Sequence, residues 1–156
     1  FFLESYNERV MAEAGITQRF VQDNHSYSTK NVLRGLHYQY ERPQGKLIRV
    51  VSGEVLDVAV DLRRSSPMLG KWVSVLLSGE RKNIFWLPVG VAHGFLVRSE
   101  NAHVLYKATD FYDVKAERTI LWNDRDLQID WGFESDPFIS AKDAQGITFK
   151  EASKFD

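Results

Sequence analysis

Short segments in which apolar and polar side chains alternate constrain the fold of this chain most strongly. Between residues 46 and 109 these segments are KLIRVV, GEVLDVAVDL, KWVSVLL, NIFWLP, GFLVRS and AHVLYKAT, separated by SGE, RRSSPMLG, LSGERKN, PVGVAHG and SENA. Alternation with a period of two is typical of β-strands, and Gly, Pro, Ser and Asn favour turns. In GEVLDVAVDL it predicts a half-buried strand with Leu56, Val58, Val60 and Leu62 on its apolar face. Closely spaced strands without helices between them predict an all-β antiparallel barrel or sandwich.

The remainder of the chain predicts little regular structure. The best helix candidate runs from Asn7 to Ala14, and Phe1–Tyr6 is interpreted as part of a strand. The tail, residues 124–156, is irregular, and we expect its aromatic residues to pack on the barrel; they are Trp131, Phe133 and Phe138. Because 156 residues suffice for one core and no linker or repeat is visible, residues 1–156 are predicted to form a single domain.

The composition argues against several classes of function. The 20 basic and 21 acidic residues leave a net charge of −1, so nothing draws the chain as a whole to nucleic acid or an anionic membrane. Without cysteine it has no disulfide, thiolate zinc site or cysteine nucleophile. No apolar run approaches the roughly 20 residues that span a bilayer, and the charged start is unlike a signal peptide. We therefore expect a cytoplasmic protein without nucleic-acid or membrane partners.

The segment NVLRGLHYQ, residues 31–39, carries polar side chains where a barrel strand usually has aliphatic ones. In an extended strand His37 and Gln39 share one face, and a glycine separates Arg34 from the histidine. A single histidine in this position can equally be a hydrogen-bonded residue at a strand edge. Its significance depends on which other groups the fold brings to it.

Three further groups could join this histidine in a small barrel. Lys46 opens the strand after the turn QG, Tyr106 lies in the strand AHVLYKAT, and His93 ends the turn PVGVAH. Taken alone, Lys46 is also compatible with a solvated lysine, and Tyr106 with a core tyrosine whose hydroxyl is satisfied. Together they would supply an imidazole, an ammonium and a phenol to one site.

The spacing P-x-G-x-x-H, which ends at His93, resembles the second metal motif of the cupin superfamily. The first cupin motif is normally H-x-H followed by a glutamate, whereas this chain has His37-Tyr38-Gln39 and is one imidazole short. A stable divalent site needs three or four converging His or carboxylate ligands, and the ammonium of Lys46 would oppose a cation. The interpretation is a cupin-like barrel without a bound metal.

Nine blocks, in order and in register, are similar to the dTDP-4-dehydrorhamnose 3,5-epimerase family. They are FFLESYN, FVQDNHS, NVLRGLHYQ, QGKLIRVVSGEVLDVAVDLRRSSP, GKWV, VAHGF, LYKATDFY, ILWND and SAKD, and they cover the chain from Phe1 to about Asp143. The resemblance implies a cupin-type antiparallel β-barrel (jelly roll) with short peripheral helices, a homodimer, and no cofactor. It implies epimerisation of dTDP-4-dehydro-6-deoxy-D-glucose at C3 and C5 to dTDP-4-dehydro-L-rhamnose. The family has about one further strand and a loop before FFLES, so this N-terminal part is expected to be missing from the chain.

Inverting a carbon beside a ketone requires a base, a group that stabilises the enolate, and an acid on the opposite face. The resemblance implies that His37 is the base and that Asp143, from the block SAKD, orients it. It assigns enolate stabilisation to Lys46 and the acid role to Tyr106. By position alone, Asp143 would be interpreted as a surface or helix-capping carboxylate.

The same resemblance implies the residues that hold the substrate. Arg34 corresponds to a contact with the diphosphate, for which a guanidinium is well suited. The other matching positions are Gln22, Asn24, Glu4, His93, Tyr112 and Lys142. For Gln22, Asn24 and Glu4, ordinary loop or edge-strand polarity is the alternative interpretation.

Three alternative functions share much of this pattern. An epimerase acting at C3 or C5 alone, for a secondary-metabolite sugar, would keep nearly every motif. A metal-dependent cupin enzyme would need a further ligand besides His37 and His93. A non-catalytic sugar-binding module would keep Arg34 and the aromatic residues but has no use for a base, an enolate cation and an opposed acid together.

Overall fold

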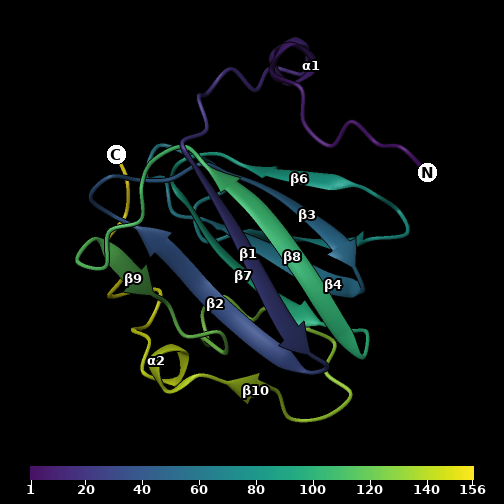
Figure 1. The fold of residues 1–156 in the computed structure, drawn as a ribbon. Helices are drawn as coiled ribbons and strands as arrows, with labels where there is room; N and C mark the ends of the chain where they lie inside the picture. Colours follow the sequence, from purple (N-terminus) through teal and green to yellow (C-terminus); the bar gives the residue numbers. More distant parts are fainter.

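A computed structural model describes residues 1–156 as two β-sheets that face each other (Figure 1). The smaller sheet has the strand order β1 (Gln22–Thr29), β8 (Asn101–Ala108), β3 (Lys46–Ser52) and β6 (Ile84–Leu87). The larger sheet has the order β10 (Phe138–Ile139), β2 (Val32–Gln39), β7 (Val91–Val97), β4 (Glu54–Asp61) and β5 (Trp72–Ser78), and β9 (Glu117–Thr119) also pairs with β2. All pairs are antiparallel except β10 with β2. The predicted all-β antiparallel class is confirmed, although the sheets stay separate and do not close into a continuous barrel.

The strands predicted between residues 46 and 109 are all present, but β7 begins earlier than expected. Its first residues, Val91 to Gly94, were predicted to be part of a turn, yet they pair in register with Val58 to Asp61 of β4. Backbone pairing in the sheet overrides the turn preference of the neighbouring glycine and proline. His93 therefore lies inside a strand.

Two apolar cores lie on the two faces of the larger sheet. The inner core fills the space between the sheets and includes Ile48, Val50, Val55, Phe95 and Val104. The outer core lies between the larger sheet and the C-terminal tail and includes Leu33, Leu36, Val58, Ile120 and Trp131.

This second core corrects the prediction that the strand GEVLDVAVDL is half-buried. Asp57 is 0% exposed and Asp61 is 7% exposed, so β4 is covered on both faces. The sequence alternates because one face meets the tail and the other meets the smaller sheet and the polar groups between the sheets.

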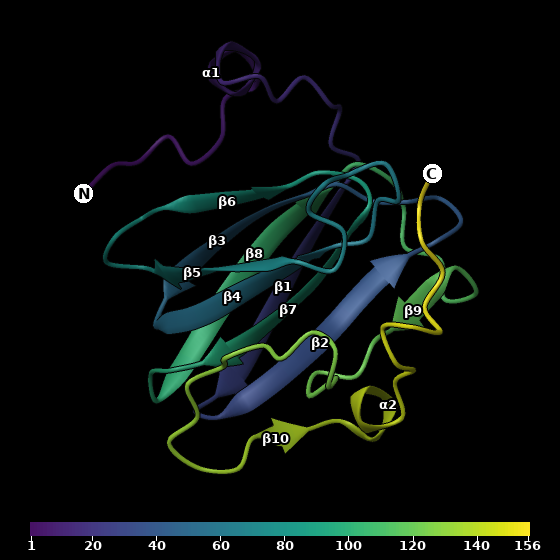
Figure 2. The same ribbon diagram turned by 180° about the vertical axis from the view of Figure 1, so that it is seen from behind.

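One tryptophan of the tail is buried in the outer core. Trp131 is 2% exposed, and its indole Nε1 donates a hydrogen bond of 2.9 Å to the Trp122 carbonyl. Phe133 packs edge-on against Trp122 but stays 38% exposed. Phe138 is 66% exposed, so the prediction that it packs on the barrel is wrong; its backbone pairs with Val32 instead. The tail also carries the short helix α2 (Ala141–Ala144), which lies beside β2 (Figure 2).

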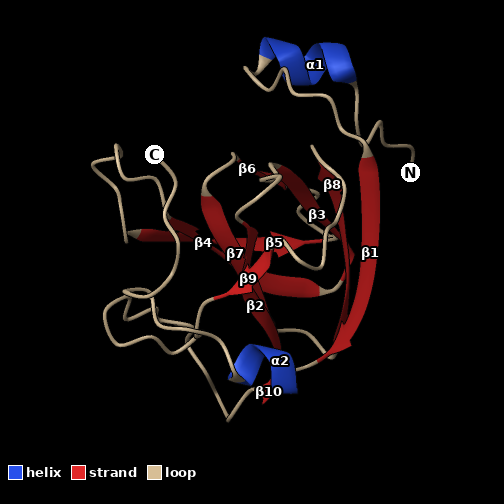
Figure 3. Ribbon diagram, turned by 90° about the vertical axis from the view of Figure 1, so that its left-hand side faces the viewer, coloured by secondary structure: helices blue, strands red, loops and turns tan.

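The first 20 residues form an N-terminal arm that stands off the sheets (Figure 3). It holds the predicted helix, α1 (Glu8–Glu13), whose N-cap Asn7 accepts hydrogen bonds from two backbone N–H groups. No residue of α1 is buried, and Phe1–Tyr6 forms no strand, contrary to the prediction. Aromatic edge contacts from Tyr6 to Phe20 and from Phe20 to Trp86 connect the arm to β6. Neither helix is long and apolar enough to cross a membrane.

Replacing the buried tryptophan measures how much the packing of the tail contributes to the free energy of unfolding. Trp131→Ala is expected to lower the free energy of unfolding by about 3–5 kcal/mol, because it leaves a large cavity in the outer core. Urea unfolding measures the change. The control Phe138→Ala removes an exposed ring and should change the free energy by less than about 1 kcal/mol. Equal effects of the two substitutions would contradict the tail's role as a core layer.

Candidate active site

A bulge in β2 decides which way His37 points. The register of β2 against β7 shifts between Arg34 and His37. Leu36 packs in the outer core, so the next side chain, His37, turns toward the space between the sheets. At the bulge Gly35 has φ +119°, and a Cβ there would lie 2.6 Å from Gly94 Cα, so only glycine fits this close approach.

His37 is held by a carboxylate 106 residues away in the sequence. His37 Nε2 lies 2.5 Å from Asp143 Oδ1, and Asp143 Oδ2 accepts a 3.2 Å hydrogen bond from the Gly35 backbone N–H. The Asp143 side chain is 3% exposed, whereas that of His37 is 25% exposed. Burial raises the pKa of Asp143, but the hydrogen bonds from His37 and Gly35 outweigh it, so the pKa is below its ordinary value. The ionised carboxylate fixes the proton on Nε2 and leaves Nδ1 as the proton acceptor.

Two groups of the smaller sheet line the opposite wall. Lys46 of β3 places its Nζ 5.8 Å from the centre of the Tyr106 ring of β8. Burial lowers the pKa of Lys46 to about 8, against the opposing influence of Asp57 and Glu117. Burial raises the pKa of Tyr106, so the phenol keeps its proton at neutral pH. A cation and a protonated phenol thus line one sheet, and an imidazole lines the other.

A second histidine–carboxylate pair is buried beside the first. His93 Nε2 lies 2.9 Å from Asp57 Oδ2, and the two side chains are 7% and 0% exposed. Burial lowers the pKa of His93 and raises that of Asp57, so it disfavours the charged form of each group. Asp57 Oδ1 has no hydrogen-bond partner in the protein. No group of three or more His, Cys, Asp or Glu side chains is arranged to hold a metal ion.

Sequence reasoning missed both Asp57 and Glu117. Asp57 alternates with the apolar residues of GEVLDVAVDL, so the sequence pattern alone predicts that it lies on the polar face of a half-buried strand. Glu117 gives no sequence signal, because it lies in the three-residue strand β9, where it pairs with Gln39. Its Oε2 accepts a 2.9 Å hydrogen bond from the Tyr112 hydroxyl and lies 2.8 Å from Lys142 Nζ. Glu117 therefore connects two of the expected substrate-binding residues.

The remaining candidates on β1 and β2 lie near Tyr106 and Tyr112. Arg34 Nε donates a 2.9 Å hydrogen bond to the Ser28 hydroxyl, and its charge acts to lower the pKa of Tyr106. Gln22 accepts a 2.9 Å hydrogen bond from the Tyr112 backbone N–H, and its amide donates one of 3.0 Å to Asn24. These contacts place Gln22 and Asn24 beside the loop that carries Tyr112.

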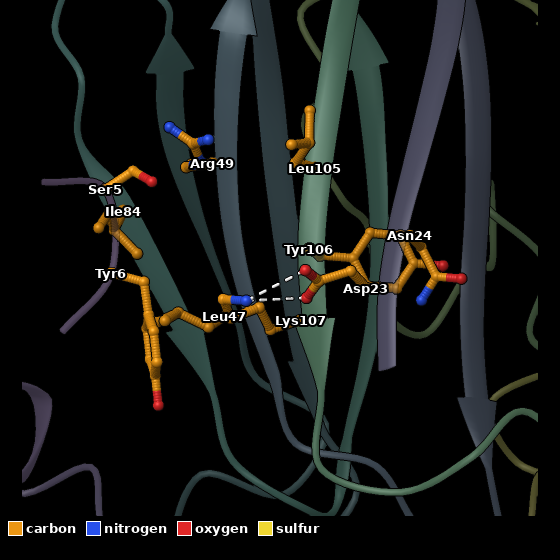
Figure 4. A pocket seen from close by; sticks show the side chains of 10 residues that line it. All are labelled: Ser5, Tyr6, Asp23, Asn24, Leu47, Arg49, Ile84, Leu105, Tyr106 and Lys107. Carbon is orange, nitrogen blue, oxygen red and sulfur yellow. Dashed lines mark hydrogen bonds and ion pairs between the residues drawn. The ribbon is translucent and has the colours of Figure 1, made fainter. Parts of the chain in front are cut away.

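Glu4 is not brought to this cluster. It lies in the N-terminal arm, where its carboxylate accepts a hydrogen bond of 3.1 Å from Asn7. A hollow of about 150 Å³ lies beneath the arm, between Tyr6 and side chains of β1, β3, β6 and β8 (Figure 4). An ion pair between Lys107 and Asp23 crosses it, and neither His37 nor Asp143 lines it. The hollow is therefore separate from the histidine–carboxylate pair.

Comparisons with known proteins agree with one another. The profile of a family described as dTDP-4-dehydrorhamnose 3,5-epimerase matches residues 1–151. The chain is 56% identical over 156 residues to a dTDP-4-dehydrorhamnose 3,5-epimerase from Pseudomonas aeruginosa, covering 99% of this chain and 86% of that protein.

Two solved structures are also similar. A dTDP-6-deoxy-D-glucose-3,5-epimerase from Legionella pneumophila, in complex with dTDP-4-keto-L-rhamnose, superposes with a TM-score of 0.95 at 50% identity, over 98% of this chain and 82% of that one. A 3′-monoepimerase from Streptomyces bikiniensis, in complex with dTDP-quinovose, has a TM-score of 0.87 at 30% identity, over 94% of this chain and 75% of that one.

The lowered pKa of Lys46 predicts that this residue reduces stability. Below pH 8 the folded protein must hold a buried ammonium, and this penalty disappears as the pH rises from about 8 to the ordinary value of 10.5. Lys46→Met should therefore raise the free energy of unfolding at pH 7. The full pKa shift would correspond to about 3 kcal/mol, and the gain should be smaller than this because Lys46 keeps some solvent contact.

Denaturant unfolding at pH 7 and pH 10 checks the prediction. The control Lys150→Met changes an exposed lysine and should have little effect at either pH. If Lys46→Met were less stable than the unmodified protein at pH 7, the idea that burial of the Lys46 ammonium reduces stability would be wrong.

Proposed function

This chain belongs to the dTDP-4-dehydrorhamnose 3,5-epimerase family, and on that premise we propose that it inverts C3 and C5 of dTDP-4-dehydro-6-deoxy-D-glucose to give dTDP-4-dehydro-L-rhamnose. It is an isomerase with a cupin-type fold. The single observation that carries the reaction mechanism is the placement of His37 and Tyr106 on opposite sheets, facing the same interior. A sugar ring between the sheets would be reached from one side by the imidazole and from the other by the phenol.

His37 is proposed as the base that removes the proton beside the ketone. Its pairing with Asp143 supports this role, because a carboxylate on Nε2–H leaves Nδ1 to accept the proton and stabilises the imidazolium that forms. Partial exposure of His37 leaves it open to a substrate, whereas His93 is enclosed with Asp57. This difference favours His37 as the base and gives His93 a role in lining the pocket.

Lys46 and Tyr106 are proposed to complete the inversion. As the proton leaves, negative charge develops on the ketone oxygen, and a fixed ammonium stabilises it most at that moment. Tyr106 would then deliver its phenolic proton to the opposite face of the carbon. The raised pKa of Tyr106 supports this role, because the hydroxyl carries its proton at working pH. The ketone itself acidifies both neighbouring carbons, so we propose no cofactor.

Arg34 and Lys142 are proposed to hold the diphosphate, with Gln22, Asn24, Tyr112 and Glu4 around the nucleotide. Arg34 on β2 and Lys142 on α2 are both accessible to a ligand, and each lies on an element that also carries one member of the His37–Asp143 pair. Charge-assisted contacts to phosphate oxygens would fix the sugar between the sheets. For Glu4, which lies in the arm, support comes only from the sequence resemblance.

Inversion at two centres is favoured over inversion at one. Identity to the 3,5-epimerases from P. aeruginosa and L. pneumophila is 56% and 50%, against 30% to the 3′-monoepimerase.

We propose that residues 1–156 form one epimerase domain, that it works as a homodimer, and that it acts in the cytoplasm. Support for the homodimer comes only from the sequence resemblance. The absence of cysteine is compatible with a reducing compartment.

Proton NMR in deuterium oxide separates the roles of base and acid. Exchange of a substrate C–H with solvent needs only the base and the enolate stabiliser, whereas inversion also needs the opposed acid. With dTDP-4-dehydro-6-deoxy-D-glucose as substrate, His37→Ala should abolish both exchange and inversion. Tyr106→Phe should retain exchange while losing much of the inversion, and Lys46→Ala should slow both. A folded His37→Ala variant that exchanges and inverts at the unmutated rate would refute the assignment.

The proposed diphosphate contact predicts a binding defect. Arg34→Ala should raise KM about 10- to 100-fold with a smaller change in kcat, because a charge-assisted contact contributes about 1.5–3 kcal/mol. Steady-state kinetics measures the effect, and Arg125→Ala, at an exposed arginine of the tail, is the matched control. Unchanged KM and kcat would remove Arg34 from the site.

A further inference from the structure

One carboxylate holds two of the groups that the proposed function assigns to the substrate. Glu117 Oε2 accepts the hydrogen bond from Tyr112 and lies 2.8 Å from Lys142 Nζ. Burial raises the pKa of Glu117, but the contacts with Lys142 and Tyr112 outweigh it, so the pKa is lowered and the group is ionised. The Glu117 side chain is 16% exposed, whereas that of Lys142 is 54% exposed. The carboxylate is thus largely buried, and the ammonium is the partner that solvent or a ligand can reach.

The position of this pair connects it to the reacting groups. Lys142 directly precedes Asp143 on α2, and Glu117 lies on β9 across from Gln39, two residues beyond His37. The charge of Glu117 also influences the pKa of Lys46 and of Tyr106. Glu117 therefore holds a proposed diphosphate ligand on the strand that pairs with the one carrying His37, and its charge acts on Lys46 and Tyr106.

We propose that Glu117 is an electrostatic latch, a positioning residue that holds Lys142 until the diphosphate of the substrate takes over the ammonium. The proposal rests on the proposed function, because it needs a nucleoside diphosphate at Lys142. A diphosphate carries more charge than one carboxylate and offers several acceptor oxygens, so it competes well for an exposed ammonium. The exchange is easy because ion pairs with a partly exposed partner are weak.

Release of Lys142 would change the charge balance around His37. Glu117 then loses its closest cation and keeps its position near the imidazole. Its negative charge favours the imidazolium that forms when His37 takes a proton. Binding of the diphosphate is thereby coupled to the ability of His37 to take a proton. A substrate without the diphosphate would leave Lys142 paired with Glu117.

A double-mutant cycle tests the latch. The variants are Glu117→Gln, Lys142→Met and the double substitution, and the probe is dTDP, titrated by calorimetry. Glu117→Gln removes the charge but keeps the shape and an acceptor for Tyr112. It should tighten dTDP binding roughly two- to fivefold, because the diphosphate no longer competes with a carboxylate. In the Lys142→Met background the same substitution should have a clearly smaller effect.

Kinetics adds a measurement that a purely structural role would not move in the same direction. Glu117→Gln should lower KM without raising kcat, whereas a residue that only holds Lys142 in place for binding would raise KM when changed. The matched control is Glu41→Gln, which breaks the exposed ion pair with Arg118, the neighbour of Glu117 on β9. It should leave dTDP binding and KM unchanged.

The possible failures are distinguishable. If the unmodified protein does not bind dTDP, the proposed function fails and the latch fails with it. If the unmodified protein binds dTDP, the latch alone is refuted by weaker binding to Glu117→Gln, or by equal tightening in both backgrounds. Thermal unfolding checks that each variant is folded. The variants in the Lys142→Met background give the coupling between Glu117 and Lys142 in dTDP binding, independently of the stability of Glu117→Gln.

Discussion

The contact on which the site depends is the one between Asp143 and two groups of β2. The carboxylate accepts from the Gly35 backbone N–H with one oxygen and lies against His37 Nε2 with the other. It therefore satisfies a backbone group left free at the bulge and orients the imidazole with the same side chain. Charge-assisted hydrogen bonds of this kind each contribute about 1.5–3 kcal/mol, so the tail is fastened where the chemistry is proposed.

The covering of the larger sheet by the tail makes this contact possible. The outer core buries Trp131 and Ile120 against the sheet, and α2 follows at the edge of β2. Ser140 caps α2 by accepting a hydrogen bond of 3.1 Å from the Asp143 N–H, which holds the carboxylate in place. Packing of apolar side chains on one face of the sheet thus positions a charged group for the other face.

The space between the sheets contains both an apolar core and ionisable groups. Lys46 and the pair His93–Asp57 are desolvated there, which shifts their pKa values and reduces stability. Gln39 holds the loop over this region, with its Oε1 accepting a 2.7 Å hydrogen bond from the Asp113 N–H. Glu117 adds a fixed charge beside that loop. A polar interior of this kind is typical of sites where stability is given up for chemistry.

The sequence by itself determined the strands between residues 46 and 109, the helix that begins after Asn7, the fold class and the family, because local alternation, turn residues and nine ordered blocks are readable along the chain. It also named His37 and Asp143, but only by resemblance. The tertiary structure decided what depends on long-range packing: that β4 is covered on both faces, that His93 lies in a strand, and that Phe138 stays exposed. It alone showed Asp57 and Glu117, because a carboxylate in a strand looks solvated until the other sheet, or a lysine of the tail, is placed beside it.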